Sequence, residues 1–146
     1  MNQQARIMCA VDLSWRSEGA FKYAVAIAKA RRAPLDVLFA VSDRHPFGWR
    51  VRERVAQLAD LRGRVSQAGV DMTLTVQHGK PAKVILQHAA SSAGSPGLIV
   101  LGAPTRGGFG RWRKPSVAQA VVHQTDRPIL MIWPERPRST LTAQRK

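Results

Sequence analysis

The segment Leu98–Ile132, LIVLGAPTRGGFGRWRKPSVAQAVVHQTDRPILMI, carries the clearest structural pattern in the chain. An apolar run is followed by a long loop rich in glycine and arginine, a helical pattern that opens at Ser116, and a second apolar run. This pattern predicts a strand, a loop, a helix and a strand. A glycine-rich loop that leads into a helix N-terminus can bind phosphate, because free backbone N–H groups and the helix dipole favour an anion there.

The rest of the chain repeats this alternation of apolar runs and helical patterns. The apolar runs predict strands at Arg6–Val11, Leu35–Val41, Met72–Gln77, Leu98–Leu101 and Pro128–Trp133. Helical spacing predicts helices over Ser17–Arg32, from Val51 to a stop at Gly69, and over Ala82–Ser91 and Ser116–Gln124. Such alternation predicts one α/β domain, a parallel sheet with helices on both faces. Ligands bind these sheets at the carboxyl ends of the strands, so we expect Asp12, Val41 and Gly102 to converge.

Length and composition agree with one globular domain. The chain has 146 residues, and 45% of them are hydrophobic. No apolar run approaches the ~20 residues of a membrane span. The single cysteine, Cys9, excludes an internal disulfide framework and lies where the first strand would bury it. We therefore expect a cytoplasmic protein.

The net charge is strongly positive. Lysine and arginine total 23 against 9 acidic residues, a formal charge of +14. Such a field attracts polyanions and speeds their association, but it does not identify them. Nucleotides, nucleic acid, acidic proteins and anionic lipid all remain open, as does a solvated basic surface with no dedicated partner.

Three segments together resemble the universal stress protein family. They are IMCAVDLSWRS (residues 7–17), HGKPAKVILQHA (residues 78–89) and the segment Leu98–Ile132. The resemblance covers roughly residues 5 to 134, and we expect a domain over residues 1–134 with a basic, disordered tail at 135–146. It implies a three-layer sandwich of the adenine-nucleotide alpha hydrolase type, with five parallel strands in the order 3-2-1-4-5. It also implies a stress-response function as a binding or signalling module.

Some members of that family bind ATP through the motif G-x-x-G-x9-G-[S/T]. Laid on this chain without gaps, the motif places Gly102 and Ser116 at matching positions, while Thr105 and Pro115 replace two glycines. Thr105 is β-branched and resists positive φ, although its hydroxyl can still bind phosphate. Pro115 has no N–H to donate, and its φ is fixed. Charge-assisted hydrogen bonds from Arg106 could compensate for the lost amides.

The resemblance also suggests which residues contact the nucleotide. They are Ala10, Val11, Asp12, Val41, Gly102, Thr105, Arg106, Ser116 and Val117. ATP is the expected cofactor, with Mg²⁺ entering only together with ATP. Two alternatives stay open at this stage: Ser116 could act solely as a helix cap, and Asp12 solely as a turn residue.

The last strand suggests a partner. In the order 3-2-1-4-5 the strand Pro128–Trp133 is an edge, and its apolar side chains invite pairing. Members of the family commonly dimerise through this strand. We therefore predict a homodimer with two antiparallel fifth strands.

Other chemistry finds little support in the sequence. The four histidines lack close ligand spacing, Cys9 has no partner for a zinc site, and neither a nucleophile elbow nor a Walker A triplet occurs. Slow ATP hydrolysis would rest on Asp12 alone. Nucleic-acid binding would rest on one Arg-Gly-Gly triplet, Arg106–Gly108, beside two aromatic residues. The remaining alternative is a family member without nucleotide that works through protein contacts.

Overall fold

The computed structural model describes residues 5–41, 50–91, 96–103 and 116–134. Five parallel strands form one sheet in the order β3-β2-β1-β4-β5. The strands are β1 (Arg6–Val11), β2 (Leu35–Val41), β3 (Met72–His78), β4 (Pro96–Gly102) and β5 (Ile129–Ile132). The helices are α1 (Trp15–Arg31), α2 (Val51–Gln67), α3 (Pro81–Ala90) and α4 (Val117–Gln124). The predicted fold and strand order are confirmed.

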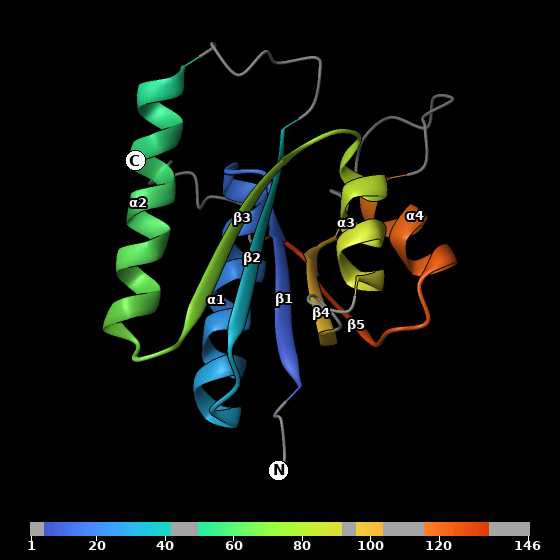
Figure 1. The fold of residues 1–146 in the computed structure, drawn as a ribbon, viewed down its shortest axis with the longest axis horizontal. Coiled ribbons are helices and arrows are strands. Elements are labelled where there is room, and N and C mark those ends of the chain that lie inside the picture. The colour runs from blue at the N-terminus through green and yellow to red at the C-terminus, as the bar shows by residue number, and fades with distance from the viewer. Residues whose placement is uncertain (1–4, 42–49, 92–95, 104–115, 135–146) are drawn as a thin grey trace, which may run out of the picture.

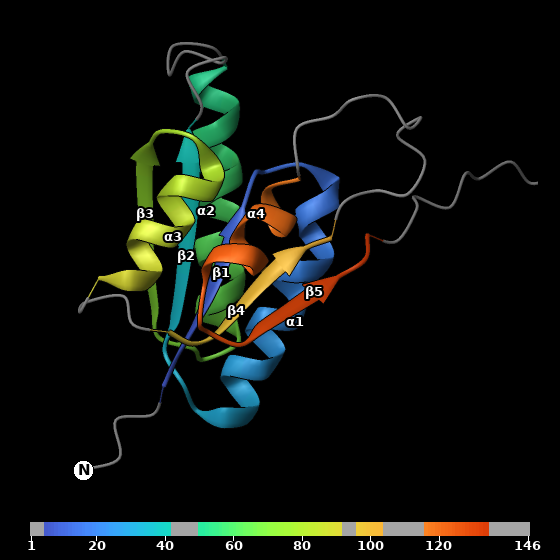
Figure 2. The same cartoon turned by 90° about the vertical axis from the view of Figure 1, so that its right-hand side faces the viewer.

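Helices cover both faces of the sheet. Figure 1 shows α1 and α2 on one side and α3 and α4 on the other, and Figure 2 views the α3 and α4 side. Alternate residues of β1 serve the two layers: Ile7 and Cys9 pack toward α1 and α2, whereas Met8 packs toward α3 and α4. All three side chains are fully buried. Burial on both faces explains why the central strands read as continuous apolar runs.

Helix α1 lies close to the sheet because its inner face is small. Ala20, Ala24 and Ala28 are fully buried at helical spacing, and Phe21 adds the one large side chain. The helix begins two residues before the predicted Ser17, because the hydroxyl of Ser14 caps it by accepting a hydrogen bond from the Arg16 N–H.

Helix α2 uses only half of its predicted apolar face. Leu61 and Val65 are buried, whereas Val55 is 57% exposed. No residue from Val51 to Asp60 is buried. The periodicity correctly predicted a helix, but it did not show that only Leu58, Leu61 and Val65 of this face reach the core. Tyr23 of α1, which has the spacing of the buried face, is likewise 56% exposed.

The remaining boundaries differ from the prediction by one or two residues. α3 begins at Pro81, β4 begins at Pro96, and Ser116 precedes α4 as its N-cap. Within the part of the chain that the structure describes, no helix combines the length and apolar character needed to cross a membrane. The predicted tail at 135–146 lies outside the described residues.

Candidate functional site

The carboxyl ends of β1 and β4 form the point at which the chain changes direction across the sheet. From β1 the chain passes through α1 to β2 on one side, and from β4 it passes through α4 to β5 on the other. The two helices cover opposite faces (Figure 2). In open α/β sheets this switch point is where ligands bind, because the two departing connections leave a crevice.

Asp12 follows β1 at this point and is held in a tight turn. Its Oδ1 accepts hydrogen bonds from the Ser14 N–H at 2.8 Å and from the Ser14 hydroxyl at 2.6 Å. Leu13, between them, has a φ of 63°, a left-handed conformation that is uncommon for a residue with a Cβ. Among the described residues, Oδ2 of Asp12 has no partner, so one oxygen of this exposed carboxylate is available to a ligand.

Gly102 lets the first turn of α1 lie against the end of β4. A Cβ at this position would be 3.1 Å from the carbonyl oxygen of Arg16. That separation is tighter than ordinary van der Waals contact, and the neighbour is backbone, which cannot move aside cheaply. Glycine therefore avoids a tight contact here, independently of any role in phosphate binding.

The N-terminus of α4 carries a complete capping box. The Ser116 hydroxyl accepts a hydrogen bond from the Gln119 N–H at 3.1 Å, and the Ser116 N–H donates to Gln119 Oε1 at 3.2 Å. This leaves the hydroxyl proton of Ser116 and the first-turn amides of Val117 and Ala118, which have no acceptor within an α-helix. These donors and the positive end of the helix dipole favour an anion.

The other predicted site residues divide into three groups. Val11 and Val41 are buried at the carboxyl ends of β1 and β2, and Ala10 is half-buried one residue earlier in β1. The carbonyl of Val41 accepts a hydrogen bond from the Gly79 N–H at 3.0 Å. Thr105 and Arg106 lie outside the described residues, as does Pro115.

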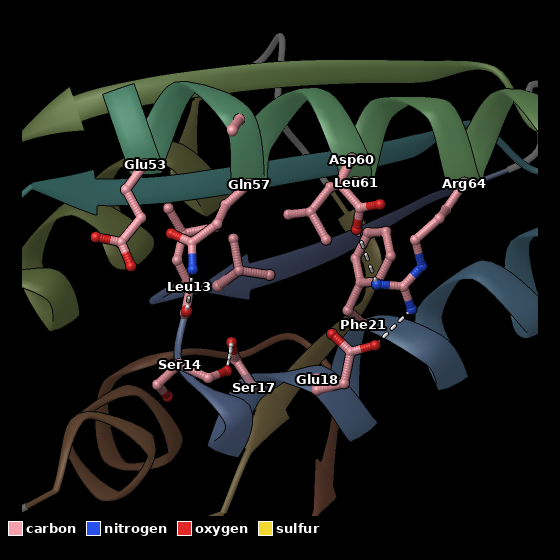
Figure 3. A pocket seen from close by; sticks show the side chains of 12 residues that line it. Leu13, Ser14, Ser17, Glu18, Phe21, Glu53, Gln57, Asp60, Leu61 and Arg64 are labelled. Carbon is pink, nitrogen blue, oxygen red and sulfur yellow. Dashed lines mark hydrogen bonds and ion pairs between the residues drawn. The ribbon is translucent and has the colours of Figure 1, made fainter. Parts of the chain in front are cut away.

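A cavity of about 460 Å³ opens beside the same turn, between α1 and α2. Figure 3 shows Leu13, Ser14 and Ser17 on its α1 side and Gln57 and Leu61 on its α2 side. This cavity was not expected from the sequence. The spacing of charged residues along α2 was a sign in the sequence that one side of this helix is polar. Nothing in the sequence indicated that the N-terminal half of the helix would stay clear of the core.

A second feature that the sequence analysis missed lies at the amino end of the sheet. Asp36, the second residue of β2, is 2% exposed, and its Oδ2 is 2.6 Å from Nε2 of His88 on α3. The Oδ1 atom is buried without a partner. One signal was present: an aspartate interrupts an apolar strand, and His88 has the same helical spacing as the buried Val84 and Ile85.

The described residues contain no cluster of metal ligands. No group of three or more histidine, cysteine, aspartate or glutamate side chains there could hold a metal ion. The Cys9 thiol is fully buried, and burial raises its pKa from 9.0 to about 12, so it is an unreactive core group.

Comparison with known proteins supports the resemblance found in the sequence. The model of the universal stress protein family matches residues 5–132. A universal stress protein in complex with cAMP has a TM-score of 0.72 and 21% identity, covering 92% of this chain and 100% of that chain. The Archaeoglobus fulgidus universal stress protein in complex with dAMP has a TM-score of 0.67 and 20% identity over 88% and 98% of the two chains. An Arabidopsis thaliana family protein with AMP bound has a TM-score of 0.68 and 18% identity over 93% and 98%.

Proposed function

The chain belongs to the universal stress protein family, and from that premise we propose that it binds an adenine nucleotide at the carboxyl ends of β1 and β4. One observation carries the proposal: the turn at Asp12, the glycine at Gly102 and the first turn of α1 meet at the switch point of the sheet. Three structures of similar fold hold cAMP, dAMP and AMP. Each of those ligands combines an adenine base, a sugar and a phosphate.

The chemistry of the described residues suggests how the nucleotide is oriented. A carboxylate repels phosphate and accepts hydrogen bonds, so Asp12 Oδ2 suits a sugar hydroxyl or the adenine amino group. The N-terminus of α4 suits the phosphate, because Ser116 and the first-turn amides offer donors. Val11 and Val41 are buried at the carboxyl ends of β1 and β2, so we propose that the base lies against the backbone at these strand ends.

ATP with Mg²⁺ is the largest ligand that we propose for the site. Pro115 removes one backbone donor that a glycine would offer at that position of the motif. Arg106 is the side chain that we propose in compensation, because a guanidinium binds phosphate through charge-assisted hydrogen bonds. Comparing AMP with Mg-ATP therefore measures what the outer phosphates contribute.

Thermal unfolding with AMP, with Mg-ATP and without ligand tests the proposal. A ligand at roughly ten times its Kd stabilises the folded state by about 1.4 kcal/mol, a rise in Tm of about 4 °C for a chain of this size. Absence of a shift with every nucleotide would overturn the proposal and leave the alternative, a family member that works through protein contacts.

Two matched substitutions separate a specific site from general charge attraction. Asp12→Asn keeps an oxygen that can accept the Ser14 hydrogen bonds but removes the charge, and we expect it to weaken binding about tenfold. Asp126→Asn removes a carboxylate whose side chain is 94% exposed, and it should leave binding unchanged. Equal effects of the two substitutions would contradict the assigned site.

We also propose the protein's wider role from the same evidence. It acts as a nucleotide-responsive binding or signalling module of the stress response, in the cytoplasm, in keeping with its one buried cysteine. The proposed partner is a second copy of the chain paired through β5. This strand is an edge of the sheet, and Met131 and Trp133 are 40% and 52% exposed at it.

A further inference from the structure

The cavity between α1 and α2 has the size and lining of a small-molecule site. Its volume of about 460 Å³ falls within the roughly 300–1,000 Å³ of ligand pockets. Apolar surface comes from both walls and from the end of β1: Val11, Leu13, Phe21, Ala56 and Leu61. Figure 3 shows Leu61 and Phe21 approaching each other across the gap between the two helices.

The polar groups around the cavity are mainly hydrogen-bond acceptors. Glu18, Glu53 and Asp60 line it, and each carboxylate has one oxygen without a protein partner among the described residues. Gln57 donates its amide N–H to the Leu13 carbonyl at 3.4 Å, which leaves its side-chain oxygen as a further acceptor. A ligand that satisfies this lining must therefore donate hydrogen bonds.

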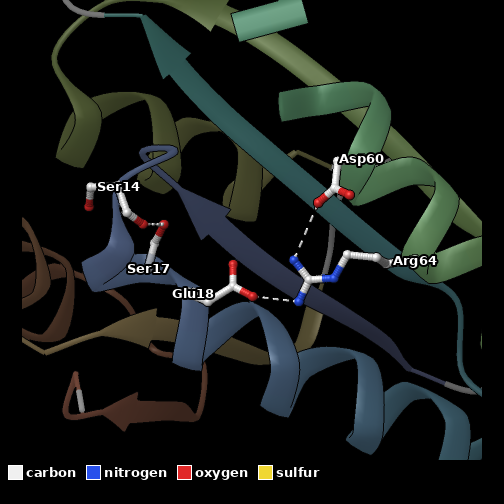
Figure 4. Close-up of polar contacts among 5 residues, drawn as sticks. All are labelled: Ser14, Ser17, Glu18, Asp60 and Arg64. Carbon is white, nitrogen blue, oxygen red and sulfur yellow. Dashed lines mark hydrogen bonds and ion pairs between the residues drawn. The ribbon is translucent and has the colours of Figure 1, made fainter. Parts of the chain in front are cut away.

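One end of the cavity already holds a cation from the chain itself. The Arg64 guanidinium lies 4.8 Å from the centre of the Phe21 ring, 2.5 Å from Glu18 Oε1 and 3.6 Å from Asp60 Oδ2 (Figure 4). The hydrogen bond to Glu18 raises the pKa of Arg64 above its ordinary value. This internal contact shows that an aromatic face and flanking carboxylates in this groove stabilise a planar cation.

We propose that the groove between α1 and α2 binds a small organic cation with a flat apolar body, such as an aryl amidinium, guanidinium or amine. The body packs on Leu13, Ala56 and Leu61, at the end away from Arg64. The cationic group donates to Gln57 and to Glu53, which also pairs with Arg50 at 3.3 Å. A metal ion suits the groove less well, because its described residues do not form a ligand cluster. The proposal stands independently of nucleotide binding at the other side of the turn.

The net positive charge of the chain means that general electrostatic attraction would not bring a cation to this groove. With a formal charge of +14, the general field of the protein repels a cation and attracts an anion. Three of the 9 acidic residues nevertheless line this one cavity. Cation binding here would depend on the local carboxylates and not on the field of the whole molecule.

Titration with benzamidine, followed by amide NMR signals in the absence of nucleotide, tests the proposal. We expect saturable shifts concentrated at Leu13, Ser17, Gln57 and Leu61. Benzamide has the same shape without the charge, and it should bind at least about fivefold more weakly, as expected for a charged hydrogen-bonding group.

Three variants separate the groove from the rest of the surface. Glu53→Gln should weaken benzamidine binding about threefold, because exposed charge pairs are individually modest. Ala56→Trp places a large side chain into the cavity from an exposed position and should abolish detectable binding. Asp126→Asn should leave the affinity unchanged.

Three results would overturn the proposal. One is equal affinity for benzamide and benzamidine, which would make the cavity merely apolar. Another is shifts spread over distant carboxylates such as Asp71 and Asp126. The third is full binding by a folded Ala56→Trp variant.

Discussion

At the scale of single residues, the most costly group to bury is the carboxyl of Asp36. It lies between β1 and β3 on the side of α3, and one of its oxygens meets only His88. His88→Leu would leave both oxygens buried without a partner. We expect the free energy of unfolding, measured with urea at pH 7, to fall by about 3 kcal/mol.

A matched histidine provides the control for this substitution. His123, in the last turn of α4, is exposed, so His123→Leu should change stability by less than about 0.5 kcal/mol. The double variant Asp36→Leu, His88→Leu should recover most of the loss, because apolar pairs replace buried polar pairs well. A loss below about 1 kcal/mol in the single variant would show that water reaches Asp36.

The buried thiol of Cys9 predicts a loss of stability at alkaline pH. Burial raises its pKa from 9.0 to about 12, so the unfolded chain releases this proton at a lower pH than the folded protein. The stabilisation is complete below pH 9 and falls between pH 9 and pH 12, by at most about 4 kcal/mol.

Comparison with Cys9→Ala isolates this effect from other groups that titrate in the same range. At pH 7 the native protein should be the more stable of the two by about 1 kcal/mol, because the variant leaves a small cavity. The difference should shrink, and then reverse, as the pH rises toward 11. Parallel stability curves for the two proteins would contradict the prediction.

At the scale of elements, two substitutions at the N-terminus of α4 separate the helix-capping role of Ser116 from its proposed role in phosphate binding. Ser116→Ala removes the cap and should cost about 1 kcal/mol in thermal or urea unfolding. Ser116→Asp restores the cap acceptor, so its stability should stay within about 0.5 kcal/mol of the native protein. The new carboxylate would repel phosphate, and we expect nucleotide affinity to fall at least tenfold. Undiminished AMP binding by Ser116→Asp would place the phosphate elsewhere.

The sequence predicted each element but not how much of each reaches the core. The periodicity of apolar residues and the positions of turn residues predicted every strand and helix. The strands were clear because burial on both faces of a parallel sheet makes them continuous apolar runs. The start of α1 was wrong by two residues, since either Ser14 or Ser17 could have capped the helix. The exposed half of α2 could not be predicted, because periodicity does not show how far a helix stands from its sheet.

The sequence predicted which residues lie at the carboxyl edge of the sheet, but not all of the contacts that they make there. Val41 and Gly102 end their strands and Asp12 directly follows β1, all at the carboxyl edge, as parallel topology requires. Two roles emerged only from the structure. Gly102 avoids a tight contact with the Arg16 carbonyl, and the Ser116 N–H is already bonded to Gln119. Both depend on contacts between residues whose relative positions a single sequence does not fix.

At the scale of the whole molecule, the turn at Asp12–Ser14 lies between the site that we propose for an anionic nucleotide and the groove that we propose for a cation. Toward β4, the first turn of α1 that follows it lies against Gly102, in the site that we propose for a nucleotide. Toward α2 the same turn lines the acceptor-rich cavity. A ligand in either proposed site would therefore lie beside the turn in which Leu13 has a left-handed backbone. The two proposed sites share this turn, although each can be tested without the ligand of the other.

The edge of the sheet at β5 predicts how two copies of the chain assemble. β5 pairs with β4 on one side and lies at the edge of the sheet, and its neighbourhood exposes Met131 and Trp133. An apolar edge strand of this kind invites pairing with a second copy. We expect sedimentation velocity at micromolar concentration to show twice the 16.1 kDa mass of the chain.

A charge placed on that edge tests whether β5 forms the interface. Met131→Glu should shift the sedimenting species to the monomer, because two like charges would face each other across the pair. Thr73→Glu places the same charge on β3, the opposite edge, and should leave the dimer intact. Because the Met131 side chain is exposed, the monomeric variant should keep its fold, which circular dichroism checks. A monomeric native protein, or a dimer that only Thr73→Glu disrupts, would contradict pairing through β5.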